Sequence, residues 1–156
     1  MLIRLLAAGT RLPGWVDQAY QEYARRLAAE VKLELVEIPT GRGSRGGDRL
    51  RARADEGRRM LERIEGGDHV VALEVGGRAL SSEGLADWLG LRLREGRRVV
   101  MLVGGADGLD PACLERADFR WSLSPLTFPH GLVRVILAEQ VYRAWSQLRG
   151  HPYHRG

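Results

Sequence analysis

The sequence predicts an α/β fold in which a mainly parallel sheet is covered by helices on both faces. Five short apolar stretches with strand character alternate along the 156 residues with segments whose apolar residues recur at helical spacing. This alternation is typical of α/β proteins with parallel strands. The chain contains no internal repeat and no linker long enough to separate two domains, so we expect a single domain over residues 1–156.

Each expected strand is a short, mostly apolar run, and glycine or proline follows several of these runs. Gly9 follows the first run and Pro39 the second, while the pair Gly76-Gly77 is expected to form a turn after the third. The expected strands are residues 2–8, 31–38, 68–75, 97–103 and 119–123.

Each of the first four expected helices begins at a residue type that caps or starts helices. Pro13 precedes the first, Asp48 the second and Ser81 the third, and Asp110-Pro111 places a capping aspartate before a proline in the first turn of the fourth. The expected helices cover about residues 13–27, 48–65, 81–95, a short segment after 110, and 131–148.

The composition is that of an ordinary globular protein. Hydrophobic residues make up 44% of the chain and charged residues 28%. No apolar run approaches the roughly 20 residues that a membrane-spanning helix needs. The single cysteine, Cys113, can form no internal disulfide and is expected to be apolar filler in a short helix. We therefore expect a cytoplasmic protein without membrane association.

The positive charge of the chain is carried almost entirely by arginine. The formal net charge of +4 is compatible with nucleic-acid binding but does not require it. Residues 40–47 form a loop rich in glycine and arginine that contains Arg42 and Arg45. Such a cluster can bind RNA phosphates, and it can equally be a solvated loop. The residues alone leave both alternatives open.

The strand expected at 97–103 runs directly into Gly104-Gly105. In open α/β sheets, ligands bind at the carboxyl ends of strands, and glycine lets the backbone approach a ligand closely. The residues that follow match neither the dinucleotide fingerprint nor the P-loop, which requires a lysine. A tight turn and a ligand-binding loop are both compatible with this glycine pair.

The helix expected at 131–148 has a wide apolar side on which Arg134 lies. A charge there is costly unless it is paired or serves a site, although an arginine in a first turn can also extend to water. Because the preceding loop is rich in proline and ends in histidine, we favour a role in a site. The wide apolar side also indicates burial against the sheet or against a second subunit.

Residues 151–155 bring two imidazoles, a phenol and a guanidinium together at the end of the chain. Chain ends usually carry less chemistry than this. Aromatic and cationic side chains together suit an unpaired RNA base, through stacking and phosphate contact. A metal site is the weaker interpretation, because no carboxylate or cysteine lies near His151 and His154 in the sequence.

These features occur within motifs that resemble the ribosomal RNA large-subunit methyltransferase H family of the SPOUT superfamily. The resemblance covers the whole chain. Its N-terminal and central motifs are Ala8-Gly9-Thr10 with Pro13 and Trp15, Glu37-Ile38-Pro39, and Val103-Gly104-Gly105 with Gly108-Leu109. Its most specific motifs are Trp121-Ser122-Leu123-Ser124, Leu126-Thr127, Pro129-His130, Leu132-Val133-Arg134-Val135, Glu139-Gln140, Tyr142-Arg143-Ala144-Trp145 and His151-Pro152-Tyr153-His154-Arg155.

The resemblance implies a C-terminal trefoil knot, a rare exception to the rule that chains are unknotted. It also implies S-adenosylmethionine as the methyl donor. The residues implied to bind it are Leu73, Gly104, Gly105, Leu123, Ser124, Pro125, Leu126, Thr127 and Phe128. Pro125 and Phe128 depart from the residues usual in the family, and we expect the loop to tolerate them because it binds largely through backbone groups. Gly131 stands where the family often has proline, and both can begin a helix.

The family further implies a homodimer in which the partner's tail completes each site. The implied substrate is N3 of a pseudouridine in 23S ribosomal RNA of the assembled 70S ribosome. This N3 is a weakly acidic imide N–H, so the protein should supply a base and cationic donors. The residues expected in these roles are His130 or His154 as the base, Arg134, Arg155 and Arg143 as cations, and Tyr153 as a stacking platform.

Two alternative functions remain open at this point. One is a SPOUT methyltransferase for another nucleoside of ribosomal or transfer RNA. The other is a non-catalytic ribosome-binding factor that retains the fold, which we rank lower because the glycine pair and the loop 123–128 are intact. A nucleotide-dependent redox enzyme is disfavoured by the missing phosphate fingerprint.

Overall fold

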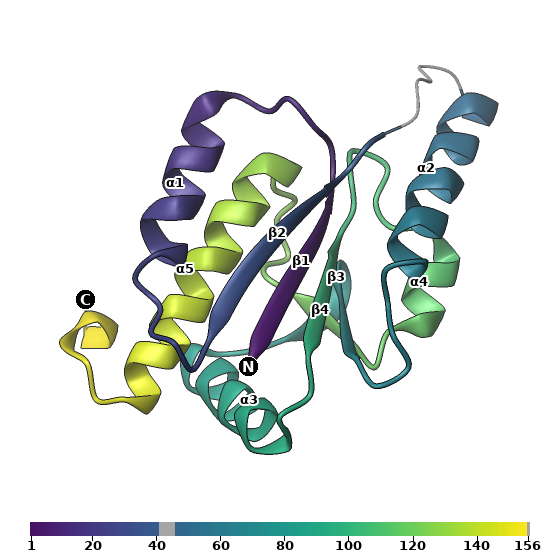
Figure 1. Cartoon of the computed structure of the whole chain (residues 1–156). Helices are drawn as coiled ribbons and strands as arrows, with labels where there is room; N and C mark the ends of the chain where they lie inside the picture. The colour runs from purple at the N-terminus through teal and green to yellow at the C-terminus, as the bar shows by residue number, and fades with distance from the viewer. Residues whose placement is uncertain (41–45, 156) are drawn as a thin grey trace.

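The computed structural model of the chain describes residues 1–40 and 46–155, and a five-stranded sheet lies at its centre. The strands are β1 (Leu2–Ala8), β2 (Lys32–Ile38), β3 (His69–Ala79), β4 (Val99–Val103) and β5 (Phe119–Ser122). Their order is β2-β1-β4-β3-β5, and each neighbouring pair is parallel (Figure 1). The predicted α/β fold with a mainly parallel sheet is confirmed.

Helices cover both faces of this sheet, as expected. They are α1 (Gly14–Ala24), α2 (Gly46–Leu61), α3 (Ser82–Glu95), α4 (Pro111–Arg116) and α5 (His130–Leu148), followed by a 3₁₀ turn, η1 (Pro152–Arg155). Helices α1, α3 and α5 pack on one face, and α2 and α4 pack on the other (Figure 1). No helix in the described part of the chain is long and apolar enough to cross a membrane.

Alternate side chains of the central strands enter two separate cores. Leu5 of β1 and Met101 of β4 point toward α1, α3 and α5, while their neighbours Leu6 and Leu102 point toward α2 and α4. This is the period-two alternation of a strand that is buried on both faces. Cys113 is fully buried in the second core, which agrees with its expected role as apolar filler.

The pair Gly76-Gly77 does not form the expected turn. Strand β3 continues through both glycines to Ala79 and pairs with β5 on both sides of a register shift between Leu73 and Arg78. A Cβ at Gly77 would lie 2.8 Å from the carbonyl carbon and oxygen of Arg120. Glycine is needed here because the two backbones approach closely, not because the chain turns.

Three expected helix boundaries are also wrong. Helix α2 begins at Gly46, so Asp48 lies inside its first turn and is not its cap, and it ends at Leu61 rather than at Glu65. Helix α1 ends at Ala24, which leaves Leu27 outside it although its spacing is helical. Leu27 still packs against the larger core, so its apolar character comes from packing in a loop.

Other local signals are confirmed. The Oγ of Ser81 accepts a 3.0 Å hydrogen bond from the backbone N–H of Gly84 and caps α3. The Oδ2 of Asp110 accepts a 3.1 Å hydrogen bond from the N–H of Ala112 and caps α4. Because the strands are parallel, their carboxyl ends meet at one edge of the sheet, where α5 also begins (Figure 1).

Candidate active site

A cavity of about 340 Å³ opens at the carboxyl ends of β4 and β5, between residues 73–75 of β3 and the first turn of α5. Its walls are mostly apolar and include exposed backbone of two loops. They are formed by Leu73, Glu74, Val75, Val103, Gly104, Gly105, Ala106, Gly108, Leu109, Leu114, Trp121, Leu123, Ser124, Leu126, Thr127, Phe128, His130 and Val133. An apolar cavity with a few polar groups at this edge of an α/β sheet is typical of a site for a small organic ligand.

The cavity brings together the residues that the sequence assigns to the cofactor, with one exception. Leu73 comes from β3, the glycine pair from the end of β4, and the remaining residues from the loop 123–128. Pro125 is exposed and does not line the cavity. Glu74, Leu109 and Val133 line it too. Leu109 and Val133 lie in motifs of the family resemblance but were not assigned to the cofactor, and no pattern in the sequence singled out Glu74.

The glycine pair is both a tight turn and a wall of the cavity. A Cβ at Gly104 would lie 2.6 Å from the carbonyl carbon of Gly108, so no other residue fits without moving the turn. The carbonyl of Gly105 accepts a 3.1 Å hydrogen bond from the N–H of Gly108, which has a positive φ of 75°. The turn therefore holds its backbone against the cavity.

The loop after β5 is held by serine hydroxyls. The Oγ of Ser122 donates to the carbonyl of Ser124 at 3.0 Å, and the Oγ of Ser124 accepts from the N–H of Leu126 at 3.0 Å. The side chain of Leu126 is 69% exposed although it borders the cavity. These two hydrogen bonds help to hold the loop beside the cavity.

His130 begins α5 and lies between the cavity and the end of β1. A Cβ at Gly9 would lie 3.3 Å from Nε2 of His130 and 3.6 Å from Nη2 of Arg134. Gly9 has a positive φ of 107°, so it admits the imidazole where a side chain would not. Burial lowers the pKa of His130, and the nearby Arg134 cation lowers it further. The ring is neutral at pH 7 and can accept a proton.

Arg134 does not extend to water, and it does not line the cavity beside His130. Its side chain is 2% exposed. Nη1 donates to Oε2 of Glu37 at 2.7 Å, and Nη2 donates to the carbonyls of Ala8 at 3.1 Å and Gly9 at 2.7 Å. The arginine therefore joins α5 to the carboxyl ends of β1 and β2.

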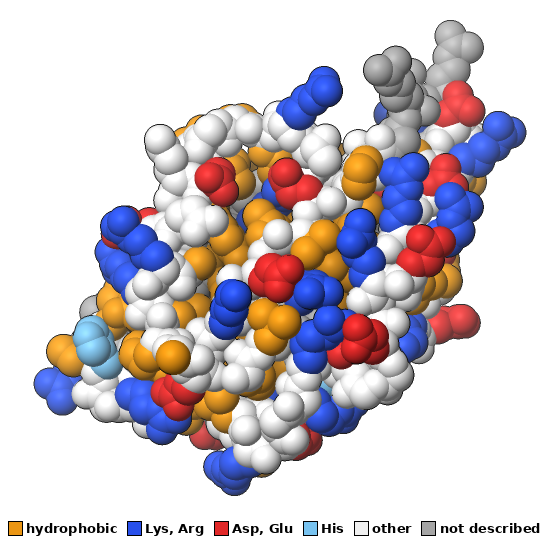
Figure 2. All heavy atoms as spheres, viewed as in Figure 1, with side chains coloured by type: hydrophobic (Ala, Val, Ile, Leu, Met, Phe, Trp, Pro, Cys, Tyr) orange, Lys and Arg blue, Asp and Glu red, His pale blue; other side chains and the backbone are white. Residues whose placement is uncertain are grey.

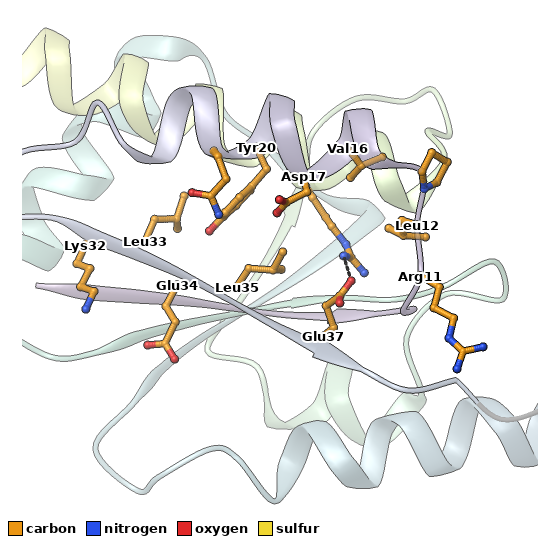
Figure 3. Close-up of a pocket in the computed structure, with 13 residues that line it drawn as sticks. Arg11, Leu12, Val16, Asp17, Tyr20, Lys32, Leu33, Glu34, Leu35 and Glu37 are labelled. Carbon is orange, nitrogen blue, oxygen red and sulfur yellow. Dashed lines mark hydrogen bonds and ion pairs between the residues drawn. The ribbon is translucent and has the colours of Figure 1, made fainter.

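A second hollow, of about 510 Å³, lies on the other side of Arg134, between α1 and the outer strand β2. Figure 3 shows Tyr20, Asp17 and Val16 reaching toward it from α1, and Leu33, Leu35 and Glu37 lying below them on β2. This hollow was not expected from the sequence, and Arg134 is the one expected site residue among the described residues that borders it.

The tail lies at the opposite end of α5 from His130. The hydroxyl of Tyr153 donates to Oε1 of Glu139 at 3.0 Å, and the same oxygen accepts from Nη2 of Arg143 at 2.7 Å. The ring of Tyr153 stands 4.6 Å from that of Tyr142, and the Arg143 guanidinium lies over it at 5.1 Å. The structure thus brings Arg143 and Tyr153 together.

The same arrangement separates the tail from the cavity. Helix α5 has 19 residues and is about 28 Å long, with His130 at its first residue and the 3₁₀ turn after its last. His154 and Arg155 belong to that turn. Tyr153, which precedes them, folds back onto Glu139 in the middle of α5, and neither His154 nor Arg155 lines the cavity beside His130 of the same chain.

The remaining basic candidates lie elsewhere. Arg42 and Arg45 fall outside the described residues, and the neighbouring Arg49 and Arg51 at the start of α2 are exposed. Figure 2 shows basic side chains gathered over α2, at the right of the view. Across residues 1–40 and 46–155, no group of three or more histidine, cysteine, aspartate or glutamate side chains is placed to hold a metal ion.

Fold and cavity define a parallel α/β protein with a mostly apolar cavity at one edge of its sheet. The family described as "Predicted SPOUT methyltransferase" matches residues 1–154. The chain belongs to this family.

Similar proteins carry the name "Ribosomal RNA large subunit methyltransferase H". One, from Alkalilimnicola ehrlichii, is 59% identical over 155 residues, which are 99% of each chain. Others are from Thioalkalivibrio sulfidiphilus, 56% identical over 99% of each chain, and Methylococcus capsulatus, 54% identical over 99% of this chain and 100% of the relative. The resemblance inferred from the motifs is confirmed.

Proposed function

We propose that the protein transfers a methyl group from S-adenosylmethionine to N3 of a pseudouridine in 23S ribosomal RNA of the 70S ribosome. The observation that carries this proposal is the cavity itself, where the glycine pair, the loop 123–128 and His130 meet. The relatives named for large-subunit RNA methylation support the choice of substrate. The trefoil knot implied by the family remains part of the proposal.

The cavity suits the proposed methyl donor. Leu109, Leu123 and Val133 offer apolar walls for a flat heterocycle, and the turn at Gly104-Gly105 offers backbone groups. Glu74 brings a carboxylate to the wall, where it can attract a cationic ligand. When bound, S-adenosylmethionine supplies an activated methyl group.

The protein's own task is to handle the proton and the charge of the imide. N3 must lose its proton before it can accept a methyl group, and the resulting negative charge spreads to the flanking carbonyls. We assign the base to His130, whose ring borders the cavity and is neutral at pH 7, with His154 of a second copy as the competing candidate. Arg134 acts as a positioning residue, because both of its terminal nitrogens donate to Glu37, Ala8 and Gly9 and it does not line the cavity.

The tail is assigned to the site of a second copy. His154 and Arg155 do not line the cavity of their own chain, since the tail folds back onto Glu139 in the middle of α5, so we assign them to the cavity of another protomer. There, Arg155 and Arg143 would supply cations for the imide charge or for phosphates, and Tyr153 a ring for stacking. A homodimer follows from this proposal. Arg42 and Arg45 are proposed as further phosphate contacts.

The decisive experiment is a methylation assay on 70S ribosomes and on free subunits, with the modified nucleoside identified by mass spectrometry. We expect 3-methylpseudouridine on 70S ribosomes and little product on free subunits. Methylation of a different nucleoside would assign another SPOUT activity. Absence of both methyl transfer and calorimetric binding of S-adenosylmethionine would support the non-catalytic ribosome-binding factor instead.

The role of the tail has its own test, a mixture of two inactive variants. A chain that lacks residues 151–156 should fold and bind S-adenosylmethionine but not methylate ribosomes. His130→Ala should be inactive as well. In mixed dimers, the truncated chain's intact cavity can receive the tail of the His130→Ala chain, so mixing should restore about a quarter to a half of the activity. Full activity of the truncated chain alone contradicts the proposed role.

A further inference from the structure

The hollow between α1 and β2 contains a buried polar group without a partner. Tyr20 is 1% exposed, and its hydroxyl has no hydrogen-bond partner among the described residues. An unsatisfied buried hydroxyl destabilises a fold, and phenylalanine would fill the same space without that cost. Burial raises the pKa of Tyr20, and Glu34 and Asp17 raise it further, so the hydroxyl remains a donor and acceptor at neutral pH.

Charges around the hollow are only partly neutralised. Glu37 is paired with Arg134, and Glu34 lies 3.4 Å from Arg4. Three other charged residues that line the hollow are Arg11, Asp17 and Lys32, and none of them forms an ion pair with another described residue. All three are exposed at the rim. The rim therefore offers two cations and one acceptor-only carboxylate.

Part of the lining of the hollow is apolar. Val16 comes from α1, and Leu33 and Leu35 come from β2 (Figure 3). In Figure 2, apolar surface is visible between these two elements. These features match the parts of a nucleotide. The apolar walls suit a flat base, the hydroxyl and the carboxylate suit the N–H donors on the edge of that base, and the cations at the rim suit a phosphate.

The position of the hollow also suits RNA. His130 borders the cofactor cavity, and Arg134, which borders the hollow, follows it by one helical turn. This separation is about 6 Å along the helix axis, the rise of about two stacked nucleotides at about 3.4 Å each. Arg11, at the mouth, has the rare positive φ of 57°, which a residue other than glycine adopts at some cost.

We propose that this hollow binds a second, unpaired nucleotide of the same RNA, one or two positions from the methylated one. Its base edge donates to Asp17 and hydrogen-bonds with the Tyr20 hydroxyl, and its phosphate lies against Arg11. This inference rests on the proposed RNA methyltransferase function. An extended peptide along the free edge of β2 is the competing occupant, and the unpaired rim cations favour the nucleotide.

The test uses full-length Tyr20→Phe and Asp17→Asn, each assayed for thermal stability, S-adenosylmethionine affinity and KM for 70S ribosomes. We expect KM to rise about tenfold, the loss of a good base contact. Cofactor affinity should stay unchanged, and Tyr20→Phe should melt at the same or a higher temperature than the parent. Arg11→Ala should raise KM similarly. The matched controls are Asp87→Asn and Arg94→Ala, exposed residues of α3 that should leave KM unchanged.

The outcomes separate this inference from the proposed function. If the parent methylates ribosomes and Tyr20→Phe and Asp17→Asn keep the parental KM, the nucleotide site is wrong and the function stands. A raised KM for ribosomes with unchanged affinity for protein-free 23S RNA would assign the hollow to a peptide and overturn the inference. If the parent protein methylates no RNA, the proposed function is wrong. In that case, weaker binding of protein-free 23S RNA by Tyr20→Phe and Asp17→Asn than by the parent would still support the nucleotide site.

Discussion

The guanidinium of Arg134 donates a 2.7 Å hydrogen bond to the carboxylate of Glu37, which lies 97 residues earlier in the chain. The other terminal nitrogen of Arg134 donates to the carbonyls of Ala8 and Gly9. Strand β1 ends at Ala8 and β2 ends just after Glu37, so a single side chain joins two strand ends to the N-terminal part of α5. His130 lies one helical turn before Arg134, so the arginine also helps to fix its position.

Arg134→Ala should therefore destabilise the fold strongly. The substitution leaves two buried carbonyls without a donor and a carboxylate without its cation, a loss of about 3 kcal/mol. Urea denaturation followed by circular dichroism measures it. Glu37→Gln is the matched variant, because its amide oxygen can still accept from Arg134 and the Glu37 side chain is 42% exposed; we expect a loss of about 1 kcal/mol. Equal losses in the two variants would contradict the importance of the carbonyl contacts.

Gly104→Ala should weaken cofactor binding with a smaller effect on folding. The added Cβ would lie 2.6–2.8 Å from backbone atoms of Gly108 and Leu109, so the turn must move out of the cavity wall. We expect the dissociation constant of S-adenosylmethionine to rise at least about tenfold by calorimetry, or about 1.4 kcal/mol. Gly66→Ala is the control, since nothing lies within 4 Å of its Cβ position. Parental affinity in Gly104→Ala would mean that the turn does not touch the ligand.

The local elements were predictable because their signals lie within a few residues of one another. Ser81 and Asp110 cap their helices through hydrogen bonds to residues two or three positions later. Gly77 is a case that local signals cannot resolve, because glycine is favoured both in turns and where two backbones approach closely. Only the position of Arg120 on the neighbouring strand β5 shows that the second reason applies. Periodicity likewise placed Leu27 in a helix, although it packs from a loop.

The site was predictable only in part for a related reason. The helical periodicity of residues 131–148 placed the charge of Arg134 on the apolar side of α5. It could not identify Glu37 as the partner, because no local pattern links residues 97 positions apart. Leu73 and Leu123 are ordinary apolar residues, so only the family resemblance assigned them to a ligand. Tyr20 was predicted in no role, since an unsatisfied hydroxyl is a property of the packed structure.

Cys113 should be unreactive in the folded protein. Burial raises the pKa of its thiol to about 11, with a further contribution from Asp110. At pH 8 the reactive thiolate is therefore scarce as well as inaccessible. We expect no colour with Ellman's reagent in buffer, and one thiol per chain after unfolding in guanidinium chloride. Rapid labelling without denaturant would show that α4 opens readily from the second core.

The pH dependence of methylation should report His130. Burial and the neighbouring Arg134 lower the pKa of His130 below its ordinary value of about 6.5, so the neutral ring persists to lower pH than in a free histidine. If this ring is the base, kcat/KM rises with pH along a limb centred below about 6.5 and is level at pH 7. Initial rates on 70S ribosomes between pH 5 and 8 measure it, with enzyme stability checked at each pH.

His130→Gln should lower the rate by about 10²–10⁴-fold and remove this limb, because glutamine cannot accept the proton. His151→Asn is the control, since its side-chain oxygen can replace the ring Nδ1 that accepts from the N–H of Tyr153, and it should retain the limb. Because the pKa of His130 is lower in the folded protein than in the unfolded chain, the neutral ring favours the folded state. The contribution of His130 to the free energy of unfolding is therefore complete above about pH 6.5 and decreases as the pH falls through the pKa of the folded state. A limb that persists in His130→Gln would transfer the role of base to His154 of the partner.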